Sequence, residues 1–189
     1  MNIKKIVNIT LLFIAKRLTE ILGFLILSAG IFLFIALVSY SPEDPNFIFP
    51  ENAEINNLLG FKGSYISDIF FQSIGLVSYL VSLTLIFTGI NIILRKDFFL
   101  VIENVFYSIL YSIFGSLFLN YFYNTTFALF INGNGGFIGN YLNENFFNSL
   151  INVNENIFFY FLMILIITFF LLSINFSPKK IYNFFRKIN

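Results

Sequence analysis

The chain has 189 residues, of which 58% are hydrophobic and only 11% are charged, with a net charge of +1. An ordinary soluble domain carries about 25% charged residues, so this composition excludes a water-facing surface over most of the chain and predicts a membrane protein. The absence of Cys and His excludes disulfides, thiol chemistry and nearly all zinc sites, and the near-zero charge excludes a basic field for nucleic acid, so we expect no cofactor, no metal and no direct binding of nucleic acid.

The first 20 residues combine positive charge with an apolar run. Lys4 and Lys5 precede the apolar residues 6–15, as in a short signal-peptide core. However, Lys16 follows at once, where a cleavage region would be small and neutral. We therefore interpret residues 1–20 as a cytoplasmic amphipathic segment, an interfacial helix that runs into the first membrane span.

Four apolar runs reach the length of about 20 residues that crosses a hydrocarbon core of about 30 Å. They cover residues 21–40, 69–94, 104–122 and 157–174. Runs of this length satisfy their backbone in lipid as helices, and the second is long enough to tilt or to begin outside the bilayer. The sequence predicts an all-α membrane protein, a four-transmembrane-helix bundle.

The basic residues predict the orientation. Ten of the eleven Lys and Arg residues fall in segments 1–20, 95–103 and 175–189, which share one side if there are four spans. Lys62 lies on the opposite side, together with most of the acids. The positive-inside rule then places both termini in the cytoplasm and makes 41–68 and 123–156 the outer loops.

Three further features lie near the membrane surfaces. Glu103 is the one acid beside a span interior, and we interpret it as an interfacial helix cap near Arg95 and Lys96. In the second outer loop, a glycine cluster precedes an apolar stripe from Phe137 to Leu150, which predicts an amphipathic helix that lies on the membrane or dips into it. The stripe in tail 175–189 predicts a second interfacial helix, or else a docking helix for a following segment.

Small residues share helix faces within the first three spans. Such faces let helix backbones approach closely in lipid. Packing within one bundle is the first interpretation, and an oligomer interface is the second. The residues are Gly23, Gly30, Gly75, Ser78, Ser82, Gly89, Ser108, Ser112 and Gly115.

A succession of short motifs carries a family resemblance. Residues 38–45 read V-S-Y-S-P-E-D-P, residues 57–68 read N-L-L-G-F-K-G-S-Y-I-S-D, residues 74–80 read I-G-L-V-S-Y-L and residues 135–142 read G-G-F-I-G-N-Y-L. This succession resembles the N-terminal four-helix membrane region of the FtsK/SpoIIIE family of septal DNA translocases, over about residues 15 to 180. Ser64 and Ser67 stand where the family usually has Ala, and Asn140 stands where an acid is more common, which leaves its role open.

The resemblance implies a membrane anchor and oligomerisation module of the bacterial inner membrane, which would act at the division septum and in chromosome segregation. It implies the lipid bilayer, a homo-oligomer and other division proteins as partners. Family members carry a RecA-like ATPase after this region, and this chain lacks its phosphate-binding loop. We therefore expect no enzyme activity and no ATP binding, whether the chain is a fragment, a split gene product or an isolated module.

The candidate contact residues come from the motifs and the small faces. The turn 41–45 either only shapes its loop, with Ser41 and Asp44 at capping-box spacing, or offers a surface to division proteins. The full set is Ser41, Pro42, Glu43, Asp44, Pro45, Asn57, Gly60, Gly63, Asp68, Gly75, Ser78, Ser82, Gly89, Ser108, Ser112, Gly115, Gly135, Gly136 and Gly139. A small channel or transporter, a structural membrane protein and a membrane enzyme are the alternatives, but the spans supply few polar or catalytic groups.

Overall fold

The computed structural model describes residues 3–45, 54–123, 132–147 and 154–177. The helices in chain order are α1 (Ile3–Val38), α2 (Gly60–Ile74), the single turn η1 (Gly75–Val77), α3 (Ser78–Arg95), α4 (Phe99–Tyr123), α5 (Gly136–Leu142), the π-helical turn η2 (Asn143–Phe147) and α6 (Glu155–Ser173). The described residues contain no strand. Within these described residues, four helical stretches are long and apolar enough to cross a membrane, which confirms the all-α class with four spans.

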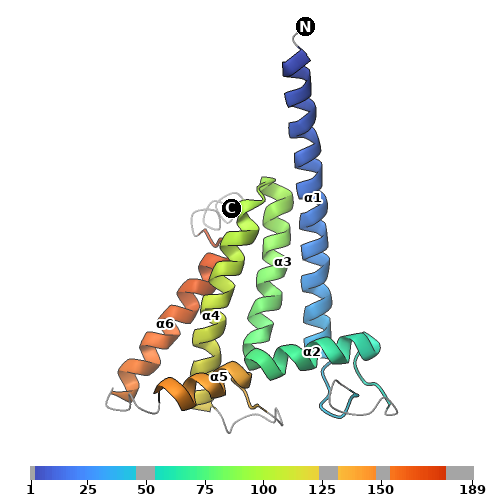
Figure 1. Cartoon of the computed structure of the whole chain (residues 1–189). Coiled ribbons are helices and arrows are strands. Elements are labelled where there is room, and N and C mark those ends of the chain that lie inside the picture. The colour runs from blue at the N-terminus through green and yellow to red at the C-terminus, as the bar shows by residue number, and fades with distance from the viewer. Residues whose placement is uncertain (1–2, 46–53, 124–131, 148–153, 178–189) are drawn as a thin grey trace, which may run out of the picture.

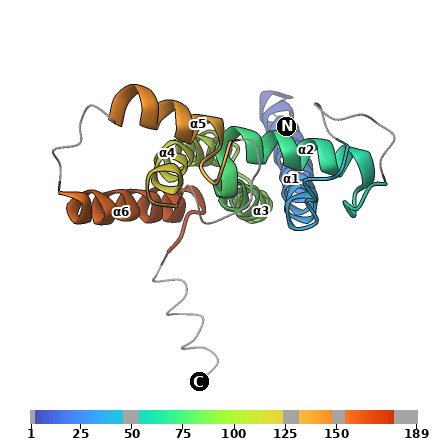
Figure 2. The same ribbon diagram turned by 90° about the horizontal axis from the view of Figure 1, so that it is seen from below.

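The long helices α1, α3, α4 and α6 run alongside one another in a row, in that order (Figures 1 and 2). In the described residues, α1 packs on α2 and α3, and α3 and α4 each contact α6. The predicted bundle is therefore open, with α1 at one edge and α6 at the other. The start of α1 and the end of α6 point to the same side of the row, the side opposite helix α2 (Figure 1).

The first helix is longer than its span. With 36 residues, α1 extends about 54 Å, well beyond a hydrocarbon core of about 30 Å. Residues 3–20 continue the helix of the predicted span 21–40 without a break and project past the other helices (Figure 1). Residues 3–20 are therefore helical, as predicted, while their interfacial position stays a prediction. The predicted tail helix lies mostly outside the described residues.

The second apolar run is divided in the structure. Gly75 has a φ of +64°, a conformation open to glycine but costly for other residues. The chain turns there, so residues 69–74 belong to α2, which lies across the helix ends, and α3 supplies the crossing (Figure 1). Residues 60–68, expected in a loop, form the first part of α2.

Two apolar clusters hold the row together. Leu33, Leu37 and Phe71 form one at the junction of α1, α2 and α3. Leu117, Phe118 and Leu162 form the other between α4 and α6. Much of the remaining apolar surface is exposed, as expected for helices in lipid.

Candidate functional site

The family-like motifs meet in one place, although they are far apart in the sequence. Helices α2 and α5 both lie across the tips of the long helices, on the side opposite the start of α1 (Figures 1 and 2). We call this assembly the ledge, and define it as residues 39–45, 54–77 and 132–142 with the adjoining end of α4. Its hydrogen bonds show how the motif residues are used.

Asp44 fastens the turn after α1 to the segment before α2. Its Oδ1 accepts the backbone N–H of Asn56 and its Oδ2 accepts that of Asn57, each at 2.8 Å. The residue is only 1% exposed. This long-range role differs from the local capping-box role expected for Asp44 with Ser41, whose backbone carbonyl accepts the Asp44 N–H at 3.2 Å.

The rest of the turn has mixed accessibility. Glu43 is exposed, Ser41 and Pro42 are half-buried, and Pro45 is buried. The Ser64 hydroxyl donates to the Pro45 carbonyl at 3.0 Å. The turn therefore shapes its loop through Asp44 and Pro45, and its contact role remains a prediction.

Asn57 also joins the end of α1 to the segment before α2. Its Nδ2 donates to the Ala36 carbonyl at 2.9 Å, and its Oδ1 accepts the Leu59 N–H at 3.0 Å. A Cβ at Gly63 would lie 2.1 Å from that Oδ1, so the position admits only glycine without movement. Gly60 has a positive φ of +64°, but a Cβ added there would meet no atom within 4 Å.

A chain of polar contacts continues along the ledge. The Tyr40 hydroxyl donates to Asp68 Oδ1 at 3.2 Å, and Asn132 Nδ2 donates to Gln72 Oε1 at 3.0 Å. Tyr40 follows the end of α1, and burial together with the neighbouring Asp68 carboxylate raises the pKa of its phenol. The phenol therefore stays protonated and keeps its hydrogen for Asp68. Asp68, one of the candidate contact residues, is only 3% exposed and lies in the middle of α2, so its carboxylate is used within the ledge.

The break between α2 and α3 is the point where the second half of the ledge joins the first. The Leu76 N–H donates to the Asn134 carbonyl at 2.9 Å. A Cβ at Gly75 would lie 1.8 Å from that carbonyl oxygen, and one at Gly136 would lie 2.6 Å from the Gly75 nitrogen. Both glycines also have a φ of +64°. The contact therefore needs glycine at each position for two reasons, the lack of room for a Cβ and the backbone conformation.

Helix α5 rests on the end of α4 through its glycines. A Cβ at Gly135 or Gly139 would lie within 2.4 Å of the Ser116 carbonyl oxygen. Asn120 donates from Nδ2 to Asn140 Oδ1. Asn140 in turn donates to the Asn132 carbonyl at 3.1 Å, so its amide joins α4 to the glycine-rich turn, a bond that a carboxylate could not donate.

The small faces of the spans also pack within the chain. A Cβ at Gly89 would lie 2.5 Å from the Leu27 nitrogen, and one at Gly30 would lie 2.7 Å from the Ile86 nitrogen, so α1 and α3 approach closely there. Ser78 and Ser82 are fully buried, and Gly115 faces Val77. This packing matches the first interpretation, and an oligomer contact through the same residues stays a prediction.

Ser108 and Ser112 line a shallow hollow beside α3 and α4, together with residues such as Val81 and Ile138. The Ser108 hydroxyl donates to the Asn104 carbonyl at 2.9 Å. The same hollow is lined by Ile74 and Ile138 of the ledge, so these two residues lie beside the ledge and not within its hydrogen bonds.

Sequence reasoning missed a buried polar cluster within the row. The Thr84 hydroxyl lies 2.9 Å from both the Tyr111 hydroxyl and the Ser173 hydroxyl, and Asn104 Nδ2 donates to Thr88 at 2.8 Å. These contacts join α3, α4 and α6 with side chains that are at most 3% exposed. The i, i+4 spacing of Thr84 and Thr88 was the available signal.

The polar groups of the ledge described above serve its internal structure. Among the described residues, no group of three carboxylates, His or Cys could hold a metal ion. Asp44 and Asp68 are both engaged in hydrogen bonds within the ledge. These contacts hold α2 and α5 together, across the ends of the long helices (Figure 1).

Comparison with known proteins decides the family. The family model described as the 4TM region of DNA translocase FtsK/SpoIIIE matches residues 15–185. The chain belongs to this family. The match confirms the resemblance carried by the motifs. Most residues of those motifs lie in the ledge.

Individual relatives agree with the family match. The chain is 33% identical over 87 residues to a DNA translocase FtsK of Azospirillum brasilense, which covers 45% of the chain and 14% of that protein. It is 31% identical over 72 residues to a DNA translocase FtsK of Rickettsia typhi (38% of the chain, 10% of that protein) and 40% identical over 55 residues to that of Rickettsia bellii (29% and 7%). The matches thus span only a small part of each relative. No solved structure gives a significant match.

Proposed function

We propose that the chain is a membrane-anchoring and oligomerisation module of an FtsK-like DNA translocase, with a role in cell division and chromosome segregation. The observation that carries the proposal is the FtsK/SpoIIIE 4TM match over residues 15–185, supported by relatives named DNA translocase FtsK. The module acts by binding and tethering and not by catalysis. Tethering raises the effective concentration of the domains attached to it.

The arrangement of the chain suits an anchor with two separate sides. The start of α1 and the end of α6 point to one side of the four long helices, and the ledge lies on the opposite side (Figure 1). A motor joined after residue 177 would therefore leave from the side opposite the ledge. We assign that side to the cytoplasm of a bacterial inner membrane, since Lys16, Arg17, Arg95 and Lys96 lie towards it.

Cysteine labelling tests this orientation, because the chain has no native Cys. Glu144→Cys lies on the ledge side and Lys16→Cys on α1 near the opposite side, and both residues are exposed. An impermeant maleimide added to spheroplasts should label Glu144→Cys at once and Lys16→Cys only after lysis. The reverse order would overturn the assigned orientation.

Septal localisation is tested in dividing bacteria with a fluorescent fusion of the full chain. The fusion should concentrate at the septum. Glu43→Lys changes the one exposed acid of the turn and should reduce septal enrichment if the turn contacts division proteins, whereas Glu144→Lys is the matched control. An even distribution around the membrane would overturn the division role. Equal septal enrichment in both variants would show that the turn does not contribute to localisation.

Oligomerisation is tested by crosslinking in native membranes. Phe24 on α1 is 63% exposed and Ile164 on α6 is 64% exposed, so a cysteine at either place is available to a second copy. Leu162→Cys is the control, because Leu162 is only 1% exposed. Dimers formed through the exposed positions and not through the control support the proposal, and the absence of dimers at both exposed positions contradicts it.

A channel is not favoured by the polar cluster of α3, α4 and α6. The Thr84 hydroxyl bonds to the hydroxyls of Tyr111 and Ser173, and all three residues are at most 3% exposed. Polar groups that bond across helices in this way hold membrane helices together. An aqueous path would instead need such groups to face water.

A further inference from the structure

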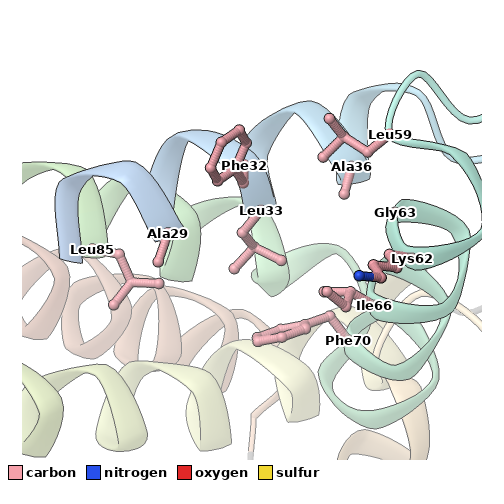
Figure 3. Close-up of a pocket in the computed structure, with 10 residues that line it drawn as sticks. All are labelled: Ala29, Phe32, Leu33, Ala36, Leu59, Lys62, Gly63, Ile66, Phe70 and Leu85. Carbon is pink, nitrogen blue, oxygen red and sulfur yellow. The ribbon is translucent and has the colours of Figure 1, made fainter. Parts of the chain in front are cut away.

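An apolar groove of about 530 Å³ lies where α2 crosses α1 (Figure 3). Helix α1 contributes Ala29, Phe32, Leu33 and Ala36, which recur at intervals of three and four and so share one face. The rest of the lining comes from the ledge and α3: Leu59, Lys62, Gly63, Ile66, Phe70 and Leu85. The groove is hollow in part because Ala29 and Ala36 have short side chains.

The groove opens towards the lipid. Ala29 and Phe32 at its rim are exposed, and α1 forms the edge of the row (Figure 2). A hydrocarbon-lined hollow of this kind, next to a bilayer, is filled most favourably by apolar chains. Its volume falls in the range of about 300–1,000 Å³ that is usual for small-molecule sites.

Lys62 gives the groove a charged rim. Its side chain is directed into the lining, with the amino nitrogen towards Ile66 and Leu33 (Figure 3). Among the described residues, the ion pairs are Arg17–Glu20 and Lys96–Glu20, so no described carboxylate pairs with Lys62. An ammonium group at the rim of an apolar groove, level with a helix that lies across the span ends, attracts an anion at the headgroup level.

We propose that this groove binds one anionic phospholipid from the leaflet on the α2 side. An acyl chain lies against Leu33, Ile66 and Phe70, and the phosphate accepts hydrogen bonds from Lys62. The combination of a narrow hollow with one inward-directed cation fits a headgroup and its chain. It fits a second copy of the chain less well, because a packed helix would leave the Lys62 charge buried without a partner.

The test measures lipid bound to the purified full chain. Delipidated protein is titrated with phosphatidylglycerol or phosphatidylcholine, and bound lipid and oligomeric mass are read by native mass spectrometry. Lys62→Gln and Lys62→Arg test the charge, with Lys16→Gln as the matched control. Ala29→Phe fills the groove, and Ala15→Phe makes the same exposed change on α1 outside it.

The wild-type chain should hold one phosphatidylglycerol more tightly than phosphatidylcholine. Lys62→Gln should reduce that preference about fivefold, as expected for one basic group at a membrane surface, whereas Lys62→Arg and Lys16→Gln should retain it. Ala29→Phe should displace both lipids, and Ala15→Phe neither. Equal preference in wild type and Lys62→Gln would overturn the proposal, and so would an Ala29→Phe variant that loses its oligomer while it keeps its lipid.

Discussion

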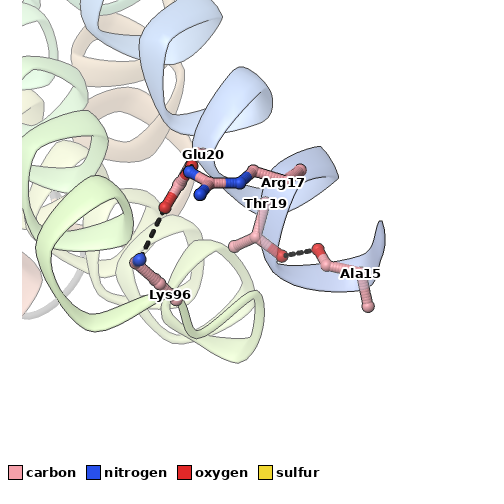
Figure 4. A network of polar contacts seen from close by, with 5 residues as sticks. All are labelled: Ala15, Arg17, Thr19, Glu20 and Lys96. Atoms are coloured by element: carbon pink, nitrogen blue, oxygen red, sulfur yellow. Dashed lines mark hydrogen bonds and ion pairs between the residues drawn. The ribbon is translucent and has the colours of Figure 1, made fainter. Parts of the chain in front are cut away.

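Lys96 Nζ lies 2.6 Å from Glu20 Oε1, and this contact joins the α3–α4 turn to the side of α1 (Figure 4). Arg17 Nη1 pairs with the other oxygen of the same carboxylate, also at 2.6 Å. One acid therefore holds two of the basic residues on the side opposite the ledge. Glu103, which was expected to lie near Lys96, is exposed, and no ion pair of it occurs among the described residues.

Glu20→Gln should remove both contacts with only a small loss of stability, because exposed ion pairs are weak and screened by salt. Unfolding in mixed micelles at low and high ionic strength measures the effect. The wild type should lose a little stability as salt rises, and Glu20→Gln should not. Glu103→Gln is the control and should respond to salt as the wild type does. An undiminished salt response in Glu20→Gln would refute the pairing.

Gly75→Ala should be among the most damaging single changes. The new Cβ would meet the Asn134 carbonyl at 1.8 Å, in addition to the strain of a φ of +64°. Gly60→Ala has the same φ with open space around it, so it should show the backbone cost alone, about 1–2 kcal/mol. The free energy of unfolding of the two variants should therefore differ clearly. Equal losses would mean that the contact with Asn134 contributes nothing.

Asp44→Ala should loosen the junction between α1 and α2. The change leaves two backbone N–H groups, of Asn56 and Asn57, without their acceptor. Asn57 is buried, so its N–H should cost about 1–3 kcal/mol, whereas the exposed Asn56 should cost less. Hydrogen exchange at these two amides should rise selectively. The neighbouring change Glu43→Ala removes an exposed carboxylate and should leave both amides protected. Unchanged protection in Asp44→Ala would contradict the assignment.

Gly89→Ala should push α1 away from α3. A Cβ there would lie 2.5 Å from the Leu27 nitrogen and 2.7 Å from the Gly23 carbonyl oxygen, so backbone must move, at a cost of about 1–3 kcal/mol. Ile90→Ala, on the exposed side of the same turn, should have little effect. The distance between spin labels on exposed positions of α1 and α3 measures the separation. An unchanged distance, with unchanged stability, would count against close packing of these helices.

The spans follow from the sequence because hydrophobic length is a local property. The family motifs were also readable, since each is a short contiguous stretch. The start of α2 was missed because Ser64, Ser67 and Asp68 have the polar character of a loop, yet they face inwards and bond within the ledge. In a membrane helix at the surface, the buried face can be the polar one.

The partners of individual side chains were beyond sequence reasoning for a different reason. Asp44 has a capping residue at the right local spacing, but its carboxylate bonds to amides 12 and 13 residues away. The Thr84 hydroxyl reaches Ser173 on a helix 89 residues later. Such pairings depend on which helices lie side by side, and the order of the row is not encoded in any one segment.

The open row has unlike edges, α1 on one side and α6 on the other (Figure 2). Copies that joined along these edges would form a heterologous, head-to-tail interface, in which one surface meets a different one and not itself. Such a joint repeats with a constant rotation from copy to copy. The wedge angle between the two edges would then determine whether a closed ring forms in the plane of the membrane and how many copies it contains.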